Sequence, residues 1–346
     1  MSIDSQNRLL HHGGKLRVAA ARYNIALERW LDLSTGINPN GWPVPAIPTE
    51  IWSRLPEEND GLEQAARNYY GAEHLLPVAG SQAAIQALPQ LRIASHVAVL
   101  SPAYAEHAHA WRRAGHTVTA VAADDLSRAV AESDVVVLIN PNNPTAVRFH
   151  HDQLLLWHRE LSERGGWLVV DEAFIDTTPE QSLCHYSSRA GLIILRSLGK
   201  FFGLAGARVG FVCAAPQLLA QLSSLLGPWT INAAARYVAT LALQDGNWQK
   251  QMQQKLPTDS ARLHSLLTAH GLIPNGGCHL FQWLCTPQAE ALHTQLAQQG
   301  ILTRLFTEPP SLRFGLPKDE QDWQRLTQAL TAATITDKTI PTGQAT

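Results

Sequence analysis

Cysteine is scarce in this 346-residue chain, and its four copies are not arranged in pairs. They show no CxxC spacing, which argues against a structural zinc site or a disulfide framework. No apolar run approaches the roughly 18 residues that a membrane span requires. The first residues lack the basic and then apolar order of a signal peptide. We therefore expect a cytoplasmic protein that does not bind membranes. The four cysteines are Cys184, Cys213, Cys278 and Cys285.

Charge of one sign is not in excess either. Lys and Arg number 27 against 29 Asp and Glu, which gives a formal net charge of -2. This balance indicates neither a nucleic-acid surface nor a polybasic membrane patch. The hydrophobic fraction of 45% supports a full globular core, and the length allows a large and a small domain.

Several catalytic motifs are absent from the sequence. A P-loop around Lys200 would need glycine at Ile194 and Ser or Thr at Phe201. No GxSxG elbow of a Ser-His-Asp hydrolase is present, and no HExxH metal motif. The chain has 15 histidines, but the adjacent pair His150-His151 is expected to point to opposite faces of an extended chain. The sequence therefore predicts no metal site.

Short apolar runs alternate with helix-length segments, which predicts an α/β fold with a mostly parallel sheet between layers of helices. The predicted strands are His96–Leu100, Val135–Ile139, Trp167–Val170, Leu192–Leu195 and Val209–Cys213. The predicted helices are Ala105–Ala114, Gln153–Arg164, Leu218–Leu226 and Ala233–Leu243.

Polar residues or prolines follow four of these strands, at Ser101, Asn140, Asp171 and Ser197. In open α/β sheets, ligands bind at the carboxyl ends of the strands. The candidate functional residues therefore fall on the edge of the sheet where a site is expected.

We expect three segments along the chain. Residues 1–48 form an N-terminal arm with one helix, Leu16–Trp30, and contribute to the small domain. Residues 49–248 form a large cofactor-binding domain, and residues 249–346 form an α+β small domain. The small domain is predicted to hold a long helix from about Lys250, strands around His279–Cys285 and Ser311–Gly315, and a helix from Lys318.

The most informative stretch is SLGKFFGLAGARVG at residues 197–210. It places Lys200 between Ser197 and Arg208, with glycines around it that permit close backbone approach. A lysine that bonds covalently to an aldehyde cofactor needs nearby anchors for the anionic part of that cofactor. Ser197 and Arg208 are suited to one phosphate group, so the stretch points to pyridoxal phosphate.

Other residues fit the same cofactor, although each has an ordinary structural interpretation. Asp171 could hold the pyridine nitrogen protonated or could only cap a turn. Asn143 could donate to the ring's 3-oxygen or belong to an Asn-Pro turn. Tyr104 could stack on the ring or lie at a rim. The segment Gly80-Ser81-Gln82 opens a helix that could bind phosphate or merely be capped.

Together these residues resemble fold-type I pyridoxal-phosphate enzymes of the aspartate aminotransferase superfamily, over nearly the whole chain. Two branches are nearest, the histidinol-phosphate aminotransferases and the threonine-phosphate decarboxylases of cobalamin biosynthesis. The segments HHGGK at residues 11–15 and DLSTGINP at residues 32–39 are similar to the decarboxylase branch. The aminotransferases usually carry Leu-Asn-x-Asn-Glu-Asn-Pro in the second segment, so the resemblance favours a decarboxylase.

The resemblance implies a role for each candidate residue. Lys200, Asp171 and Tyr104 would be catalytic. The cofactor would be held by Gly80, Ser81, Gln82, Tyr104, Asn143, Asp171, Ser197, Lys200 and Arg208. The substrate would be held by His12, Gly36, Asn38, Asn143, Arg304 and Arg313, with His12 coming from this subunit or its partner. On spacing alone, Arg304 and Arg313 could also be solvated arginines.

Some residues depart from the family pattern. Phe174 stands where many relatives have a tyrosine, and Leu55 replaces a tyrosine that in relatives reaches the partner subunit's cofactor. Asn59 is a candidate substitute for that contact. Ala146 replaces a glycine, a minor change provided that its backbone φ is negative.

The implied activity is decarboxylation of O-phospho-L-threonine to (R)-1-amino-2-propanol O-2-phosphate in cobalamin biosynthesis, by a homodimer with shared active sites. The alternatives are an aminotransferase acting on a substrate such as histidinol phosphate, and a non-catalytic sensor of the same fold. The chain has no additional basic helix-turn-helix domain, which argues against the sensor.

Overall fold

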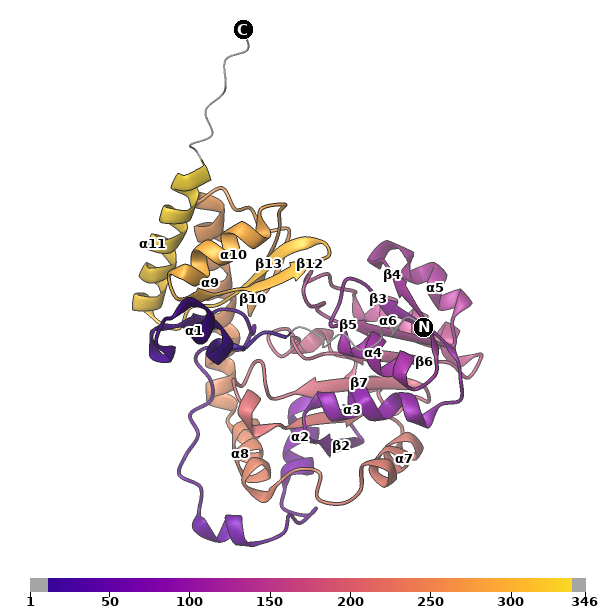
Figure 1. Cartoon of the computed structure of the whole chain (residues 1–346). Coiled ribbons are helices and arrows are strands. Elements are labelled where there is room, and N and C mark those ends of the chain that lie inside the picture. The colour runs from indigo at the N-terminus through magenta and orange to yellow at the C-terminus, as the bar shows by residue number, and fades with distance from the viewer. Residues whose placement is uncertain (1–11, 338–346) are drawn as a thin grey trace, which may run out of the picture.

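The computed structural model describes residues 12–337 and shows two lobes with a cleft between them (Figure 1). His11 and the N-terminal residues that lack a signal-peptide pattern lie outside this range. Within it, no helix combines the length and apolar character that would be needed to cross a membrane.

The large lobe is built on a seven-stranded sheet in the order β2-β8-β7-β6-β5-β3-β4. Only β8 runs against its neighbours, so the sheet is mostly parallel and the predicted fold class is confirmed. The strands are β2 (Leu75–Val78), β3 (His96–Leu100), β4 (Thr117–Val121), β5 (Val135–Ile139), β6 (Trp167–Asp171), β7 (Leu192–Ser197) and β8 (Gly210–Cys213). All five predicted strands are present. Sequence reasoning missed β2, which contains Pro77, and the exposed edge strand β4.

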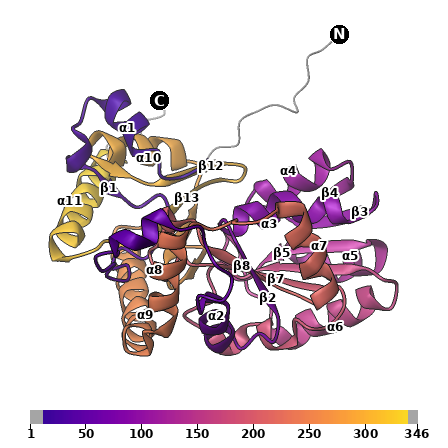
Figure 2. The same ribbon diagram turned by 90° about the horizontal axis from the view of Figure 1, so that it is seen from below.

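Alternating side chains of the central strands enter two separate cores, as the period of a strand requires. Val137, Val169 and Ile193 face the helices of one layer, and Leu138, Val170 and Ile194 face the other. Figure 2 shows these layers on the two faces of the sheet. The first layer holds α3 (Ser81–Ala87), α4 (Glu106–Arg113) and α7 (Pro216–Leu226), and the second holds α2 (Leu62–Tyr70), α5 (Leu126–Glu132), α6 (His151–Ser162) and α8 (Ala233–Gln244).

The small lobe contains an antiparallel sheet in the order β12-β13-β10-β9. Its strands are β9 (Gly276–Cys278), β10 (Phe281–Cys285), β12 (Arg304–Thr307) and β13 (Pro310–Gly315). Its helices are α9 (Gly246–Ala269), α10 (Ala289–Gln298) and α11 (Glu320–Asp337). The N-terminal arm joins this lobe because β1 (Leu31–Asp32) pairs in parallel with β11 (Ile301–Leu302). The domain boundaries near residues 48 and 248 stay a proposal.

The helix expected at Leu16–Trp30 is shorter than predicted. Helix α1 covers Leu16–Tyr23, and a separate 3-10 turn follows at Leu27–Arg29. Asn24 ends α1 in the left-handed conformation, with φ of 53°. Asparagine tolerates that conformation better than most residues, so it can terminate a helix whose apolar pattern continues.

Candidate active site

Lys200 lies in the loop after β7, at the carboxyl edge of the sheet, and its amine is buried. Its Nζ lies 3.3 Å from the carbonyl oxygen of Thr35 and 5.4 Å from the centre of the Phe174 ring. Burial is the main cause that lowers the pKa of Lys200 to about 8, and the positive charge of Arg313 adds to it. Near pH 7, the Lys200 amine is therefore neutral and nucleophilic in roughly a tenth of the molecules. An ordinary lysine amine is neutral in less than about a thousandth of them.

Asp171 ends β6 and is almost fully buried. Its Oδ2 lies 3.0 Å from Nε2 of His107 on α4, and its Oδ1 accepts a hydrogen bond from the backbone of Ala173 at 3.1 Å. These two contacts fix the orientation of the carboxylate. Asp171 is thus able to face a ring nitrogen with one defined geometry, as the cofactor interpretation requires.

The residues predicted to hold a phosphate converge around two glycines. Gly80 has a φ of +71°, and a side chain there would lie 2.5 Å from Nη2 of Arg208. A side chain at Gly210 would lie 2.5 Å from the backbone nitrogen of Ser81. Ser197 lies at the end of β7, directly opposite Gly210. The space that these glycines keep open beside a guanidinium, a hydroxyl and a helix start fits a phosphate.

Tyr104 is held at this edge by a chain of hydrogen bonds. Its hydroxyl donates to Oε1 of Gln82 at 3.2 Å, and Nε2 of Gln82 donates to Glu106 at 2.8 Å. Burial, together with the negative charge of Glu106, raises the pKa of Tyr104 to about 12. The phenol is therefore neutral at physiological pH, and its ring is available to stack on a cofactor.

Arg313 on β13 brings the small lobe to this site. It is buried, donates through Nη1 to Oδ1 of Asn143, and donates through Nη2 to the carbonyl of Ser34 at 2.7 Å. Its Nε is buried and has no hydrogen-bond partner among the described residues. Because Asn143 uses its oxygen here, its Nδ2 is the atom that could donate to a cofactor. Gly36 packs beside Arg313, with φ of +61°.

His12, Tyr104 and Arg304 line one cleft of about 950 Å³ between the two lobes. Nε2 of His12 lies 2.8 Å from Oε1 of Glu106, so the arm of the same chain already reaches the site. The backbone of Gly14 donates to Ser34, and a side chain at Gly13 would collide with the carbonyl of Ser34. These glycines allow the arm to lie close against residues 32–34.

Asn38 holds the loop that carries Lys200. Its backbone N–H donates to the carbonyl of Lys200 at 3.0 Å, and its Nδ2 donates to the carbonyl of Phe201 at 2.8 Å. These two bonds help to position the lysine. A contact between Asn38 and the substrate stays a prediction.

The condition placed on Ala146 is not met, and the expected directions of His150 and His151 are wrong. Ala146 has a φ of 59°, so the exchange of glycine for alanine is not the minor change that a negative φ would make it. His150 and His151 do not point to opposite faces, because their ring centres lie 4.3 Å apart at the start of α6. Together with Asp152 they form a largely exposed group of possible metal ligands, which sequence spacing did not indicate.

Sequence reasoning missed Arg196 and Asp176, which support the site from behind. On the opposite face of β6 and β7, Arg196 is buried and pairs with Glu172 and Asp176, both at 2.7 Å. Alternation along a strand would have placed Arg196 and Glu172 away from Ser197 and Asp171.

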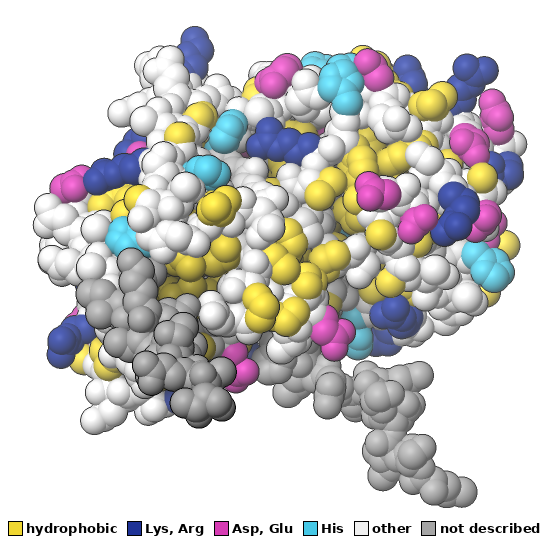
Figure 3. All heavy atoms as spheres, turned by 90° about the horizontal axis from the view of Figure 1, so that it is seen from above, with side chains coloured by type: hydrophobic (Ala, Val, Ile, Leu, Met, Phe, Trp, Pro, Cys, Tyr) yellow, Lys and Arg dark blue, Asp and Glu magenta, His cyan; other side chains and the backbone are white. Residues whose placement is uncertain are grey.

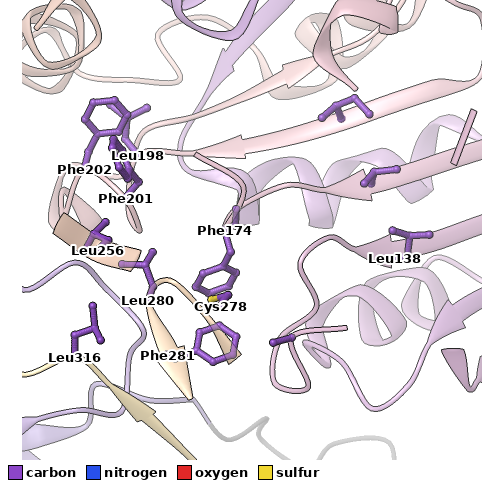
Figure 4. Close-up of a cluster of buried hydrophobic side chains, with 14 of the residues drawn as sticks. Leu138, Phe174, Leu198, Phe201, Phe202, Leu256, Cys278, Leu280, Phe281 and Leu316 are labelled. Atoms are coloured by element: carbon purple, nitrogen blue, oxygen red, sulfur yellow. The ribbon is translucent and has the colours of Figure 1, made fainter. Parts of the chain in front are cut away.

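Figure 4 shows Phe174 and Phe281, from the two lobes, meeting beside Cys278. Nothing in the sequence indicated the contact between His107 and Asp171.

We predict that replacing His107 with alanine weakens pyridoxal phosphate binding roughly 10- to 100-fold, because a hydrogen bond to a charged group is worth about 1.5–3 kcal/mol. A glutamine at this position carries its Nε2 in a similar place and should restore part of the affinity. The measurement is cofactor affinity by absorbance titration, with the exposed His264 changed to alanine as the control. Equal affinities of the His107→Ala and His264→Ala variants would contradict the prediction.

The sequence model of "Aminotransferase class I and II" matches residues 56–336 of this chain. The chain belongs to the aminotransferase class I and II family. It is 56% identical over 322 residues to a threonine-phosphate decarboxylase from Pseudomonas aeruginosa, covering 93% of this chain and 97% of that one. This places it in the decarboxylase branch, whose cofactor is pyridoxal phosphate. The residues named above as holders of that cofactor stay a prediction.

Relatives of the aminotransferase type are more distant. A histidinol-phosphate aminotransferase from Nostoc is 33% identical over 205 residues, which cover 58% of this chain and 57% of that one. The solved structure of the histidinol-phosphate aminotransferase from Sinorhizobium meliloti, in complex with pyridoxal phosphate, has a TM-score of 0.81 with 19% identity. It covers 97% of this chain and 98% of the other, and it supports the shared fold.

Proposed function

We propose that this chain decarboxylates O-phospho-L-threonine to (R)-1-amino-2-propanol O-2-phosphate, the reaction of the cobalamin pathway. The observation that carries the proposal is the buried guanidinium of Arg313. It forms no ion pair among the described residues and leaves its Nε without a partner. Such a charge is costly to bury unless an anion completes the site. A substrate carboxylate would supply that anion beside Lys200.

The cofactor supplies an electron-accepting ring for the bond that breaks. Asp171, oriented by His107, would hold a proton on the ring nitrogen and so favour the flow of electrons into the ring. When carbon dioxide leaves, the electron pair of the broken bond remains with the Cα side, and a proton must be added there. Lys200 is buried, close to the site, and has a pKa lowered to about 8, so we assign it that proton transfer.

The substrate's orientation would follow from two separate anion contacts. Arg313 would hold the carboxylate, while His12 and Arg304 on the walls of the cleft would hold the phosphate. Holding both ends would fix the orientation of the bonds at Cα, and that orientation would separate decarboxylation from amino transfer.

We also propose a homodimer whose partner completes the site. Apolar side chains around the arm and the start of α8 are strongly exposed, namely Val44, Trp52, Leu55 and Trp229 at 53%, 65%, 64% and 60%. Asn59 and Trp229 line a second cleft of about 950 Å³ in this region. Burial against a second copy would remove this apolar surface from water. The four free cysteines also agree with the proposed cytoplasmic location.

The reaction itself provides the test of this proposal. Protein loaded with pyridoxal phosphate and mixed with O-phospho-L-threonine should release one carbon dioxide per aminopropanol phosphate formed, without an added oxo acid. A transaminase would instead require 2-oxoglutarate and would produce glutamate. Strict dependence on 2-oxoglutarate would overturn the proposal in favour of the aminotransferase.

A further inference from the structure

The cleft of about 950 Å³ between the lobes is lined by several basic side chains. We propose that Lys15, Arg22, Arg112 and Arg113, here called the basic entrance, draw phosphorylated anions from solution toward Lys200. All four line the cleft that contains His12, Tyr104 and Arg304. The proposal depends on the proposed function only for the identity of the natural substrate.

Two helices place these cations on opposite walls of the cleft. On α4, Arg112 and Arg113 share a face with Ala105, Ala108 and His109, and all five line the cleft. Spacings of three and four residues put side chains on one face of a helix. On α1 the lining positions are Lys15, Val18, Ala19, Arg22 and Tyr23, which also form one face. The basic side chains of both helices therefore converge on the same space.

The charge in the cleft is uneven in a way that the whole chain is not. Among the described residues that line it, Glu308 is the one carboxylate, against five Lys or Arg side chains. The chain as a whole has a formal net charge of -2. Within the part of the chain that the structure describes, no ion pair involves Lys15, Arg22, Arg112 or Arg113. Figure 3 shows the molecule from above, with Lys, Arg and His side chains interspersed with Asp and Glu on this face.

The positive charge of Arg22 also affects a titratable group elsewhere in the cleft. The positive charges of Arg22 and Arg304, after burial, lower the pKa of His293 in the same cleft. A gradient of this kind raises the local concentration of anions and can increase association rates 10-fold or more, provided that salt does not screen it. Arg22, Arg112 and Arg113 also lie in the last turns of their helices, where cations stabilise the helix dipole. That effect concerns stability alone and would not alter the salt dependence of catalysis.

The double variant Arg112→Gln, Arg113→Gln tests the proposal without touching the residues assigned to the reaction. The matched control is Arg128→Gln, Arg159→Gln, which removes the same charge from exposed positions on α5 and α6. At an ionic strength of about 0.01 M, we expect the entrance variant to lower kcat/KM for O-phospho-L-threonine roughly 5- to 10-fold with kcat unchanged. The difference should vanish near 0.5 M, where screening is nearly complete. The control should follow the unaltered protein throughout.

A second measurement does not depend on decarboxylation. Pyridoxal phosphate is itself a phosphorylated anion, and its capture by cofactor-free protein can be followed by absorbance. The entrance variant should capture it several-fold more slowly at low salt and equally fast at high salt. A slower capture by an inactive protein would support the entrance and refute only the proposed substrate. The inference would be overturned if kcat/KM and the rate of pyridoxal phosphate capture depended on salt concentration equally in the entrance variant and its control.

Discussion

Replacing Lys200 with alanine is expected to lower the rate of decarboxylation at least roughly 1,000-fold, because one side chain provides both the covalent attachment and the proton transfer. The amine is buried, and its pKa is lowered to about 8. The measurement is single-turnover release of carbon dioxide from O-phospho-L-threonine.

The control for this prediction is the exposed Lys250 on α9, changed to alanine, which should retain full activity. Both variants are treated with pyridoxal phosphate and borohydride, and the modified peptide is identified. The Lys250→Ala variant should carry the reduced adduct on Lys200, and the Lys200→Ala variant should carry no adduct at that position. Undiminished turnover by the Lys200→Ala variant would exclude the covalent mechanism.

The second large effect is expected at Arg313. Changing it to methionine should lower kcat/KM by roughly 150- to 5,000-fold, because the substrate carboxylate would lose its buried charge partner, a loss that costs about 3–5 kcal/mol. In the structure its guanidinium is buried beside Asn143 and Ser34, and one donor is unused. Lysine in its place would keep the charge but lose the two-pronged geometry, so Arg313→Lys should recover only part of the activity. Steady-state kinetics with O-phospho-L-threonine measure both variants.

A binding measurement separates this role from a purely structural one. Arg313→Met should still capture pyridoxal phosphate, since Lys200 and Asp171 are in place, but it should bind O-phospho-L-threonine weakly. The exposed Arg128, changed to lysine, serves as the control. If Arg313→Met bound the substrate as tightly as that control, the carboxylate would have to be held elsewhere.

The candidate residues at the strand ends could be predicted from the sequence, because a strand end and the residues that follow it are local features. Asp171 follows a run of buried apolar residues, and Lys200 lies between a serine and an arginine at fixed spacing. Since the carboxyl ends of parallel strands share one edge, their assembly into one site followed from the sheet type. The reversed direction of β8 could not be seen in this way, because an apolar run has the same pattern in either direction.

Contacts between distant segments were outside the reach of local patterns. His107 is separated from Asp171 by 64 residues, and the pairing depends on how α4 packs over β6. The positive φ of Ala146 and the engagement of Asn38 with the Lys200 loop are likewise results of packing. For Asn38, the family resemblance implied a substrate contact, and the structure adds hydrogen bonds from its backbone and Nδ2 to the loop.

The sequence by itself determined the cofactor chemistry and the α/β architecture, because both rest on residue types at short, fixed spacings. Only the tertiary structure decided that Arg313 is buried without an acidic partner among the described residues. It also decided that the arm of the same chain brings His12 to Tyr104 and Arg304, and that two basic helix faces meet across one cleft. These facts depend on burial and on the docking of one lobe against the other. Electrostatic energies depend on the distance between charges and on the amount of water between them, and both are set by the tertiary structure.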